Sequence, residues 1–229
     1  MCAQRPPSNL CPVAAHVALR EACLECQGRP STGQRQLERG DVVVRQGDVA
    51  RHLFAVVSGW LRESVYDDEG RALSARMVGP GHVLGTSALA RAGTLAVTPR
   101  YAATIDVLTP ARVCFVTADH TGQWLARHPP HAVDLVVAMA KELDAGHRDL
   151  ALHAQPAEER VLALVRELVA SAPDPSAWYR LPATREQLGE VLGLTLETVS
   201  RMLHRLARRG VLEIRGREVR LIAHKTPGA

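Results

Sequence analysis

The 229-residue chain contains no apolar run long enough to cross a lipid bilayer, which argues against a membrane-spanning protein. Its first residues, MCAQRPPSNLCP, lack the apolar core of a signal peptide, so we expect a cytoplasmic protein. The ten histidines include no closely spaced His-x-His pair with a following carboxylate, which disfavours a metal-dependent cupin enzyme. We therefore expect neither a membrane protein nor an enzyme.

The chain also lacks an even set of cysteines that could all pair as disulfides. It has five, Cys2, Cys11, Cys23, Cys26 and Cys114. In a reducing compartment such thiols are expected to be free, metal-bound or redox-active rather than structurally bridged.

Positive charge is concentrated near the carboxyl end. Residues 201–225 hold eight Lys and Arg and two Glu, a local charge of +6 in a chain of net charge +4, so the remainder carries −2. This asymmetry favours a polyanionic partner. The length is sufficient for two domains, each with a hydrophobic core.

Short apolar runs recur between glycine-rich breaks from Gly40 to Phe115. They are DVVVRQGD, HLFAVVSGWLRESVYDDEGRALSARMVGPGHVLG and YAATIDVLTPARVCFV. Such β-branched segments between turn residues predict many short antiparallel strands, which at this spacing form a small barrel or jelly roll.

The pattern changes to helical spacing after Pro129 and Pro130. Apolar or small residues and one histidine then recur at alternating steps of three and four, at Val133, Val136, Ala140, Leu143, His147 and Leu150. A heptad seam of this length favours a helix that pairs with its own copy, although a helix buried within one monomer is the alternative. Pro156 ends this helix, and AEERVLALVRELVASA predicts another.

Residues 181–222 contain a composite motif. Thr184 and Gln187 form a capping box, Gly193 breaks the first helix, Thr195 can cap a second, TLETVSRMLHRLARR, and Gly210 ends it. Two helices joined by a short turn with glycine are typical of a helix-turn-helix. The segment VLEIRGREVRLI alternates about Arg215 and Gly216 as a β-hairpin, which completes a winged helix.

A β-barrel, a long helix that pairs with its copy and a carboxyl-terminal winged helix, in this order, resemble the CRP/FNR superfamily of bacterial transcription regulators. The segment LGLTLETVSRMLHRL resembles the recognition helix of the FNR-like branch of that superfamily. The resemblance implies an α+β fold with a cyclic-nucleotide-binding-like β-barrel (jelly roll), a long dimerisation helix and a carboxyl-terminal winged helix-turn-helix. The expected domains are a cysteine-containing segment (1–36), the sensor barrel (37–128), the dimerisation helix (129–155) and the DNA-binding domain (156–229).

The resemblance also assigns roles to residues. The E-x-x-S-R pattern of Glu197, Ser200 and Arg201 is expected to contact base edges in double-stranded DNA, because arginine pairs with guanine, glutamate accepts from cytosine and serine can serve either way. The remaining expected DNA-binding residues are Thr195, Thr198, Arg205 and Arg208. The implied operator is a palindrome of TTGAT half-sites bound by a homodimer, with RNA polymerase as protein partner. The expected seam residues are Val136, Ala140, Leu143, His147 and Leu150.

Cyclic AMP is not expected as the signal, because Thr86 and Tyr101 stand where the related proteins have a glutamate and a serine, and only Arg100 remains. The resemblance instead indicates a [4Fe–4S] cluster that senses oxygen or nitric oxide, since Cys114 matches the position of a strand cysteine ligand. The amino-terminal spacing C-x2-C-x5-C is missing, so the candidate ligands are Cys11, Cys23, Cys26 and Cys114, with Cys2 as a substitute. A thiol switch of Cys23 and Cys26, a zinc site, a buried structural Cys114 and another barrel ligand are the alternatives.

Overall fold

The computed structural model describes residues 32–92, 98–127, 129–172 and 174–222. The chain divides into two compact units, residues 1–146 and 147–229, and the division falls within helix α3 (Pro130–His153). None of the described helices is both long and apolar enough to cross a membrane.

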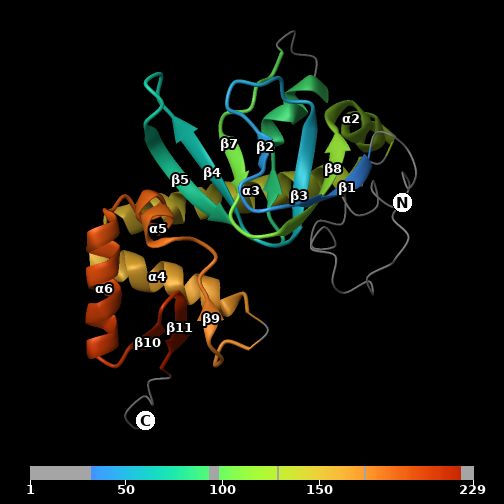
Figure 1. The fold of residues 1–229 in the computed structure, drawn as a ribbon. Helices are drawn as coiled ribbons and strands as arrows, with labels where there is room; N and C mark the ends of the chain where they lie inside the picture. The colour runs from blue at the N-terminus through green and yellow to red at the C-terminus, as the bar shows by residue number, and fades with distance from the viewer. Residues whose placement is uncertain (1–31, 93–97, 128, 173, 223–229) are drawn as a thin grey trace. The chain divides into compact units, whose positions relative to one another are not determined.

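The amino-terminal unit is built from two four-stranded antiparallel sheets (Figure 1). The first has the order β1 (Thr32–Leu37), β8 (Ala111–Thr117), β3 (His52–Ser58) and β6 (Val83–Leu84). The second has the order β2 (Val42–Val44), β7 (Thr104–Val107), β4 (Leu61–Tyr66) and β5 (Ala72–Val78). A 3-10 helix η2 (Thr86–Ala92) and helix α2 (Ala118–Arg127) complete the unit. The expected jelly-roll barrel is confirmed.

Inward-facing side chains of both sheets form one core, in which Val56, Leu61 and Val78 are fully buried. One strand was not expected: β1 starts at Thr32, before the expected barrel boundary at residue 37, and pairs with β8 along its whole length. Its sequence, TGQRQL, has no apolar alternation, so pairing with β8 and not its own composition makes it a strand.

An arginine connects the second sheet to α3 within the same unit. Arg76 Nε on β5 donates to Glu63 Oε2 on β4 at 2.6 Å, and its Nη1 donates to Glu142 Oε2 on α3 at 3.1 Å. Its burial alone would lower the pKa of Arg76, but the two carboxylates outweigh this effect and the pKa is raised, so the guanidinium stays charged.

Helix α3 carries the expected seam residues on its exposed side. Val136, Leu143 and Leu150 are 63%, 62% and 69% exposed, which leaves large apolar side chains in water. Ala140 and His147 are exposed as well. Nothing in the part of the chain that the structure describes buries these residues, which disfavours the alternative of a helix buried within one monomer.

The carboxyl-terminal unit places three helices beside a small sheet (Figure 1). Its elements are α4 (Ala157–Ala170), β9 (Tyr179–Arg180), α5 (Arg185–Leu192), α6 (Leu196–Arg208), β10 (Leu212–Arg215) and β11 (Glu218–Leu221), with the strand order β10-β11-β9. The helix-turn-helix and its hairpin are confirmed. We call the β10–β11 hairpin the wing.

Local chemistry explains the turn between α5 and α6. Thr184 and Gln187 form the expected capping box at the start of α5, and Gly193 ends that helix at φ +61°, a left-handed conformation that glycine adopts readily. A Cβ on Gly189 would lie 2.5 Å from the carbonyl oxygen of Leu194, so a glycine lets the turn approach α5 closely.

Candidate nucleic-acid interface

Helix α6 is strongly amphipathic. Val199, Leu203 and Leu206 are at most 1% exposed, and they pack into the core of the unit. Its amino end is capped by Thr195, whose hydroxyl accepts from the Thr198 backbone N–H at 3.2 Å. The buried stripe and the cap together fix which side chains of α6 point to solvent.

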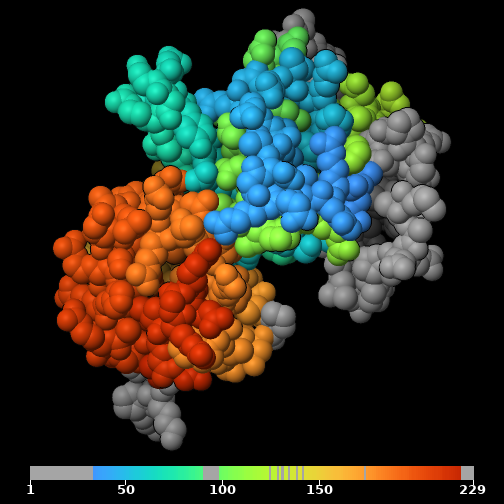
Figure 2. Space-filling view, in the orientation of Figure 1, coloured from blue at the N-terminus to red at the C-terminus, as the bar shows by residue number. Residues whose placement is uncertain are grey.

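The solvent side of α6 bears a shallow surface hollow of about 860 Å³. Figure 2 draws the unit that contains α6 as the orange to red surface. Residues of α6 alone line the hollow: Leu196, Glu197, Ser200, Arg201, His204, Ala207 and Arg208. The structure thus brings together four of the seven expected DNA-binding residues, Glu197, Ser200, Arg201 and Arg208. The remaining three, Thr195, Thr198 and Arg205, lie outside this hollow.

The charged residues of this surface are oriented by their neighbours. The pKa of the Glu197 carboxyl lies below its usual value, because its own backbone N–H and then the Thr195 hydroxyl donate to it. Glu197 is therefore a carboxylate, which can only accept hydrogen bonds. Arg201 Nη2 donates to Thr198 Oγ1 at 3.3 Å. Thr195 and Thr198 thus act here by supporting Glu197 and Arg201.

Arg205 has a partner on another helix. Its Nε lies 3.0 Å from Oε2 of Glu158 in the first turn of α4, and the other oxygen of Glu158 accepts from Arg209 Nη1. Arg205 and Arg209 remain 58% and 61% exposed, whereas Glu158 is 17% exposed. The Glu158 carboxylate therefore pairs with two arginines of the basic carboxyl-terminal segment, Arg205 and Arg209, on the side of α6 that faces α4.

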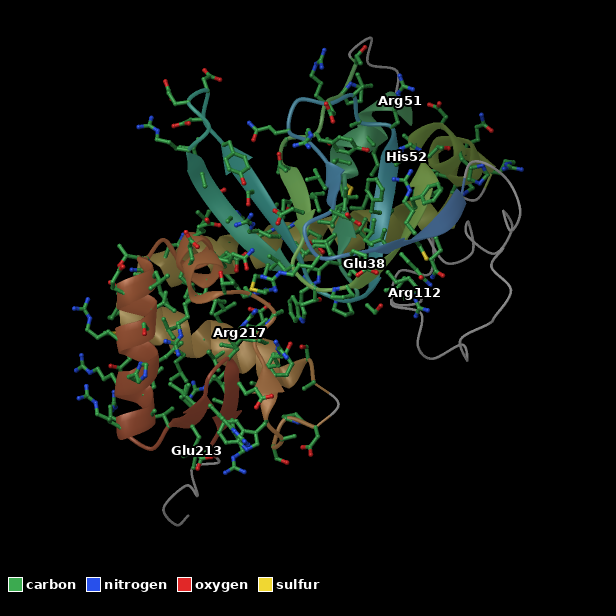
Figure 3. The ribbon with its side chains drawn as sticks, viewed as in Figure 1. Glu38, Arg51, His52, Arg112, Glu213 and Arg217 are labelled. Atoms are coloured by element: carbon green, nitrogen blue, oxygen red, sulfur yellow. The ribbon has the colours of Figure 1, made fainter. Side chains whose placement is uncertain are left out.

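Sequence reasoning missed Arg185, the first residue of α5. Its Nη1 donates to Ser200 Oγ on α6 at 2.9 Å, and its Nη2 contacts the carbonyl oxygen of Gly216 in the wing turn at 3.5 Å. A hollow of about 410 Å³ lies between these elements, and its lining includes Arg217, a residue that Figure 3 labels. The partners of Arg185 are 15 and 31 residues away, so no local motif could have revealed the contact.

In the barrel, Tyr101 is 6% exposed and belongs to the core. Its hydroxyl accepts from the backbone N–H of His52 at 3.1 Å and donates to the His52 carbonyl at 3.0 Å, at the start of β3 where Figure 3 labels His52. Arg100 Nη1 donates to the Gly47 carbonyl at 2.6 Å, and Thr86 begins η2. Arg100 and Tyr101, two of the positions compared above for cyclic AMP, are thus bonded to the barrel backbone.

Of the candidate cluster ligands, only Cys114 belongs to the described residues; Cys2, Cys11, Cys23 and Cys26 lie outside them. Cys114 is half-buried in β8, opposite Gln34 of β1 and Ala55 of β3, and Gln34 Nε2 donates to its sulfur at 3.7 Å. No group of three or more His, Cys, Asp and Glu side chains within the described part of the chain is arranged to hold a metal.

A jelly-roll barrel followed by a winged helix-turn-helix with a polar, arginine-bearing second helix is the architecture of a class of DNA-binding transcription regulators. Residues 34–128 match the cyclic nucleotide-binding domain family, and residues 159–225 match the Crp-like helix-turn-helix domain family. The chain is 32% identical over 192 residues to the transcriptional activator protein FnrA of Stutzerimonas stutzeri, covering 82% of this chain and 76% of that protein. It is 27% identical to the transcriptional activator protein anr of Pseudomonas aeruginosa, with the same two coverages. The protein belongs to the CRP/FNR family of transcription regulators, and both of these relatives are regulators rather than enzymes.

Two solved structures of other regulators share the fold. FixK2 from Bradyrhizobium japonicum superposes with a TM-score of 0.73 at 24% identity, covering 85% of this chain and 94% of that one. The regulator CLP of Xanthomonas campestris gives a TM-score of 0.66 at 21% identity, covering 84% and 95%. These likenesses establish the shared architecture.

Proposed function

We propose that the protein is a homodimer that binds an inverted repeat of TTGAT half-sites in double-stranded DNA and responds to oxygen, nitric oxide or redox state through its cysteines. The observation that carries this proposal is the capped helix α6, which presents Glu197, Ser200 and Arg201 on one exposed surface. RNA polymerase is the protein partner that such a regulator implies, and the cytoplasm is the expected compartment.

The chemistry of the three side chains supports the half-site. Arg201 can donate two parallel hydrogen bonds to guanine O6 and N7, and the Glu197 carboxylate can accept from cytosine N4. Both groups suit the single G·C pair of TTGAT. We expect Arg208, which lines the same hollow, to contact a phosphate, a contact that adds affinity and carries no sequence information.

The exposed side of α3 supports the dimer. A two-fold axis along two such helices would bury Val136, Leu143 and Leu150 of both copies and present two recognition helices to two half-sites. An inverted repeat is the DNA counterpart of that symmetry.

The surroundings of Cys114 fit a sulfur-based sensor. Its strand, β8, is the direct neighbour of β1, the first described strand after the four amino-terminal cysteines. Cys26 precedes Gln34, the residue opposite Cys114, by eight residues. An extended chain of that length spans at most about 28 Å, which is ample reach for its thiol to meet Cys114. Cys11 and Cys23 have a longer reach.

We assign Cys11, Cys23, Cys26 and Cys114 as the thiolates that would hold a [4Fe–4S] cluster, which would supply sensitivity to oxygen and nitric oxide. Several relatives are named anaerobic regulatory proteins, including that of Haemophilus influenzae, which is 27% identical over 190 residues. A disulfide between Cys23 and Cys26 is the cluster-free alternative. Cyclic nucleotide is not proposed, because Tyr101 and Arg100 are bonded to the barrel backbone.

The sensor is tested by anaerobic purification, an ultraviolet–visible spectrum, and iron and acid-labile sulfide assays before and after exposure to air. We expect absorbance near about 400 nm that is lost in air together with binding to the TTGAT repeat. Cys114→Ser should abolish the absorbance, and Cys2→Ser is the matched control that should keep it. A colourless wild-type protein that binds the same DNA would eliminate the cluster and favour the thiol switch, which a disulfide map of oxidised protein then checks.

The DNA site is tested by Arg201→Ala. We expect a loss of roughly 1–3 kcal/mol in binding free energy and relaxed specificity at one base pair of each half-site. Arg166→Ala, which removes an exposed arginine from α4, is the control for charge. An equal loss of affinity for the repeat and for scrambled DNA would contradict the assigned role of Arg201.

A further inference from the structure

Arg185 joins three elements of the DNA-binding unit. It lies directly after the cap residue Thr184, so the capping box fixes the direction in which its side chain leaves α5. From there the guanidinium forks, with Nη1 on Ser200 Oγ of α6 at 2.9 Å and Nη2 toward the Gly216 carbonyl at 3.5 Å. Gly216 occupies the wing turn at φ +63°. The two contacts fix the plane of the guanidinium.

This contact has a definite polarity. A serine hydroxyl has one donor and two acceptor lone pairs, whereas a guanidinium has donors only. In the Arg185–Ser200 bond, the Ser200 oxygen must therefore be the acceptor. The ring of His204 bonds to the Ser200 backbone carbonyl at 2.7 Å, so it does not compete for the hydroxyl. Ser200 keeps its O–H donor and one lone pair for a ligand in the adjacent hollow, and the bond from the cationic guanidinium polarises the hydroxyl toward donating.

We propose that Arg185 is a positioning residue that biases the Ser200 hydroxyl toward donating, so that a base that presents an acceptor opposite Ser200 is favoured. In the major groove this bias favours thymine O4, guanine O6 or a purine N7 over the amino groups of cytosine and adenine. The inference rests on the proposed function, because it requires α6 to lie in the major groove. It turns Ser200, which alone can serve any base, into a selective contact.

The forked geometry requires arginine. Lysine carries one point-like ammonium on a flexible stem and cannot hold two acceptors in a fixed plane, although it preserves the positive charge. The alternative role for Arg185 is a plain phosphate contact, which Lys would replace and which would not depend on the sequence of the DNA. The two roles therefore give opposite results for Arg185→Lys.

The test compares binding of full-length dimer variants to the TTGAT repeat and to every symmetric single-base substitution of its half-site. Ser200→Ala first identifies the base step that depends on Ser200, as the position where discrimination falls. We expect Arg185→Ala to reduce discrimination at that same step, by roughly tenfold, and to leave the other steps unchanged. In the Ser200→Ala background, Arg185→Ala should cause no further loss there.

Arg185→Lys should keep the overall affinity and lose the discrimination at the Ser200 step, and this variant keeps the test decisive if Arg185→Ala fails to fold. Arg166→Ala should leave the whole pattern unchanged. The proposal is overturned if Arg185→Lys retains full discrimination. It is equally overturned if Arg185→Ala weakens every site by one common factor, with the salt dependence reduced by about one phosphate contact.

Failure of the proposed operator is a separate outcome. A wild-type protein that does not prefer the TTGAT repeat over scrambled DNA would refute that operator. The preferred site would then be selected from random DNA, and the same variants would be compared on its single-base substitutions. Additive effects of Ser200→Ala and Arg185→Ala at every step of that site would overturn the assignment of Arg185.

Discussion

Leu143 lies near the middle of α3, and its truncation tests the paired-helix arrangement directly. Its side chain is 62% exposed in one chain, so most of its surface is available to a partner. Full burial of a leucine side chain contributes about 1.5–3 kcal/mol. In a two-fold symmetric homodimer the substitution is present in both subunits, so its effect is doubled, while the Cβ that alanine retains reduces the loss slightly. Leu143→Ala should therefore weaken the dimer by about 1.5–3.5 kcal/mol. That corresponds to a roughly 10- to 300-fold larger dissociation constant.

Sedimentation equilibrium over a range of protein concentrations measures this change. Leu73 of β5 is the matched control, since it is 66% exposed but lies outside the seam, and Leu73→Ala should leave the dissociation constant at the wild-type value. Leu143→Ala should also lose affinity for the full repeat more than for a single half-site. A wild-type dissociation constant for Leu143→Ala, or an equal loss in Leu73→Ala, would refute the assignment of this surface to the dimer.

Three further changes test other parts of the structure. Glu158→Gln removes the carboxylate that pairs with Arg205 and Arg209, so binding to scrambled DNA should strengthen. The salt dependence of that binding should become steeper by about one phosphate contact for each arginine that engages DNA, and an unchanged salt slope would contradict this. Burial, aided by two neighbouring arginines, lowers the pKa of His52 below 6.5, so the unfolded chain takes up a proton at a higher pH than the folded chain, and the stability of the fold should decrease as pH drops through 6.5. Thermal melting of the wild type and of His52→Gln between about pH 7.5 and 5.5 measures this pH dependence, and equal pH slopes in the two proteins would refute it. Gly146→Ala adds a methyl group that meets no neighbouring atom in the described structure, and it should stabilise α3 by roughly 1 kcal/mol in thermal denaturation, whereas a lower melting temperature would contradict this.

Elements with local signals could be predicted from the sequence. The capping box of Thr184 and Gln187, the Thr195 cap and the glycine turn at Gly193 each depend on residues within a few positions of one another. The types and spacing of these residues predict the two caps and the turn, and the structure has all three. The exposed seam of α3 likewise follows from a helical period.

Features that depend on distant pairing could not be predicted in this way. Strand β1 forms by pairing with β8, and its Gly33 lies opposite Phe115, where a Cβ would approach the ring to 2.7 Å. No nearby residue signals that contact. The Arg76 cluster and the Arg185 fork are equally non-local, since each joins side chains from separate elements. Sequence spacing supplies no information about such contacts.

The basic carboxyl-terminal segment shows why this difference matters for function. Its local charge of +6 predicts attraction to DNA, but the charge count treats all its arginines alike. The structure divides them: Arg201 and Arg208 line the hollow on α6, whereas Arg205 and Arg209 pair with Glu158, and Arg220 Nε donates to Glu213 at 2.9 Å. The salt dependence of the DNA-binding constant is determined only by the cationic side chains that reach phosphates. The wild-type slope should therefore be smaller than the number of basic residues implies, and Glu158 sets part of that difference.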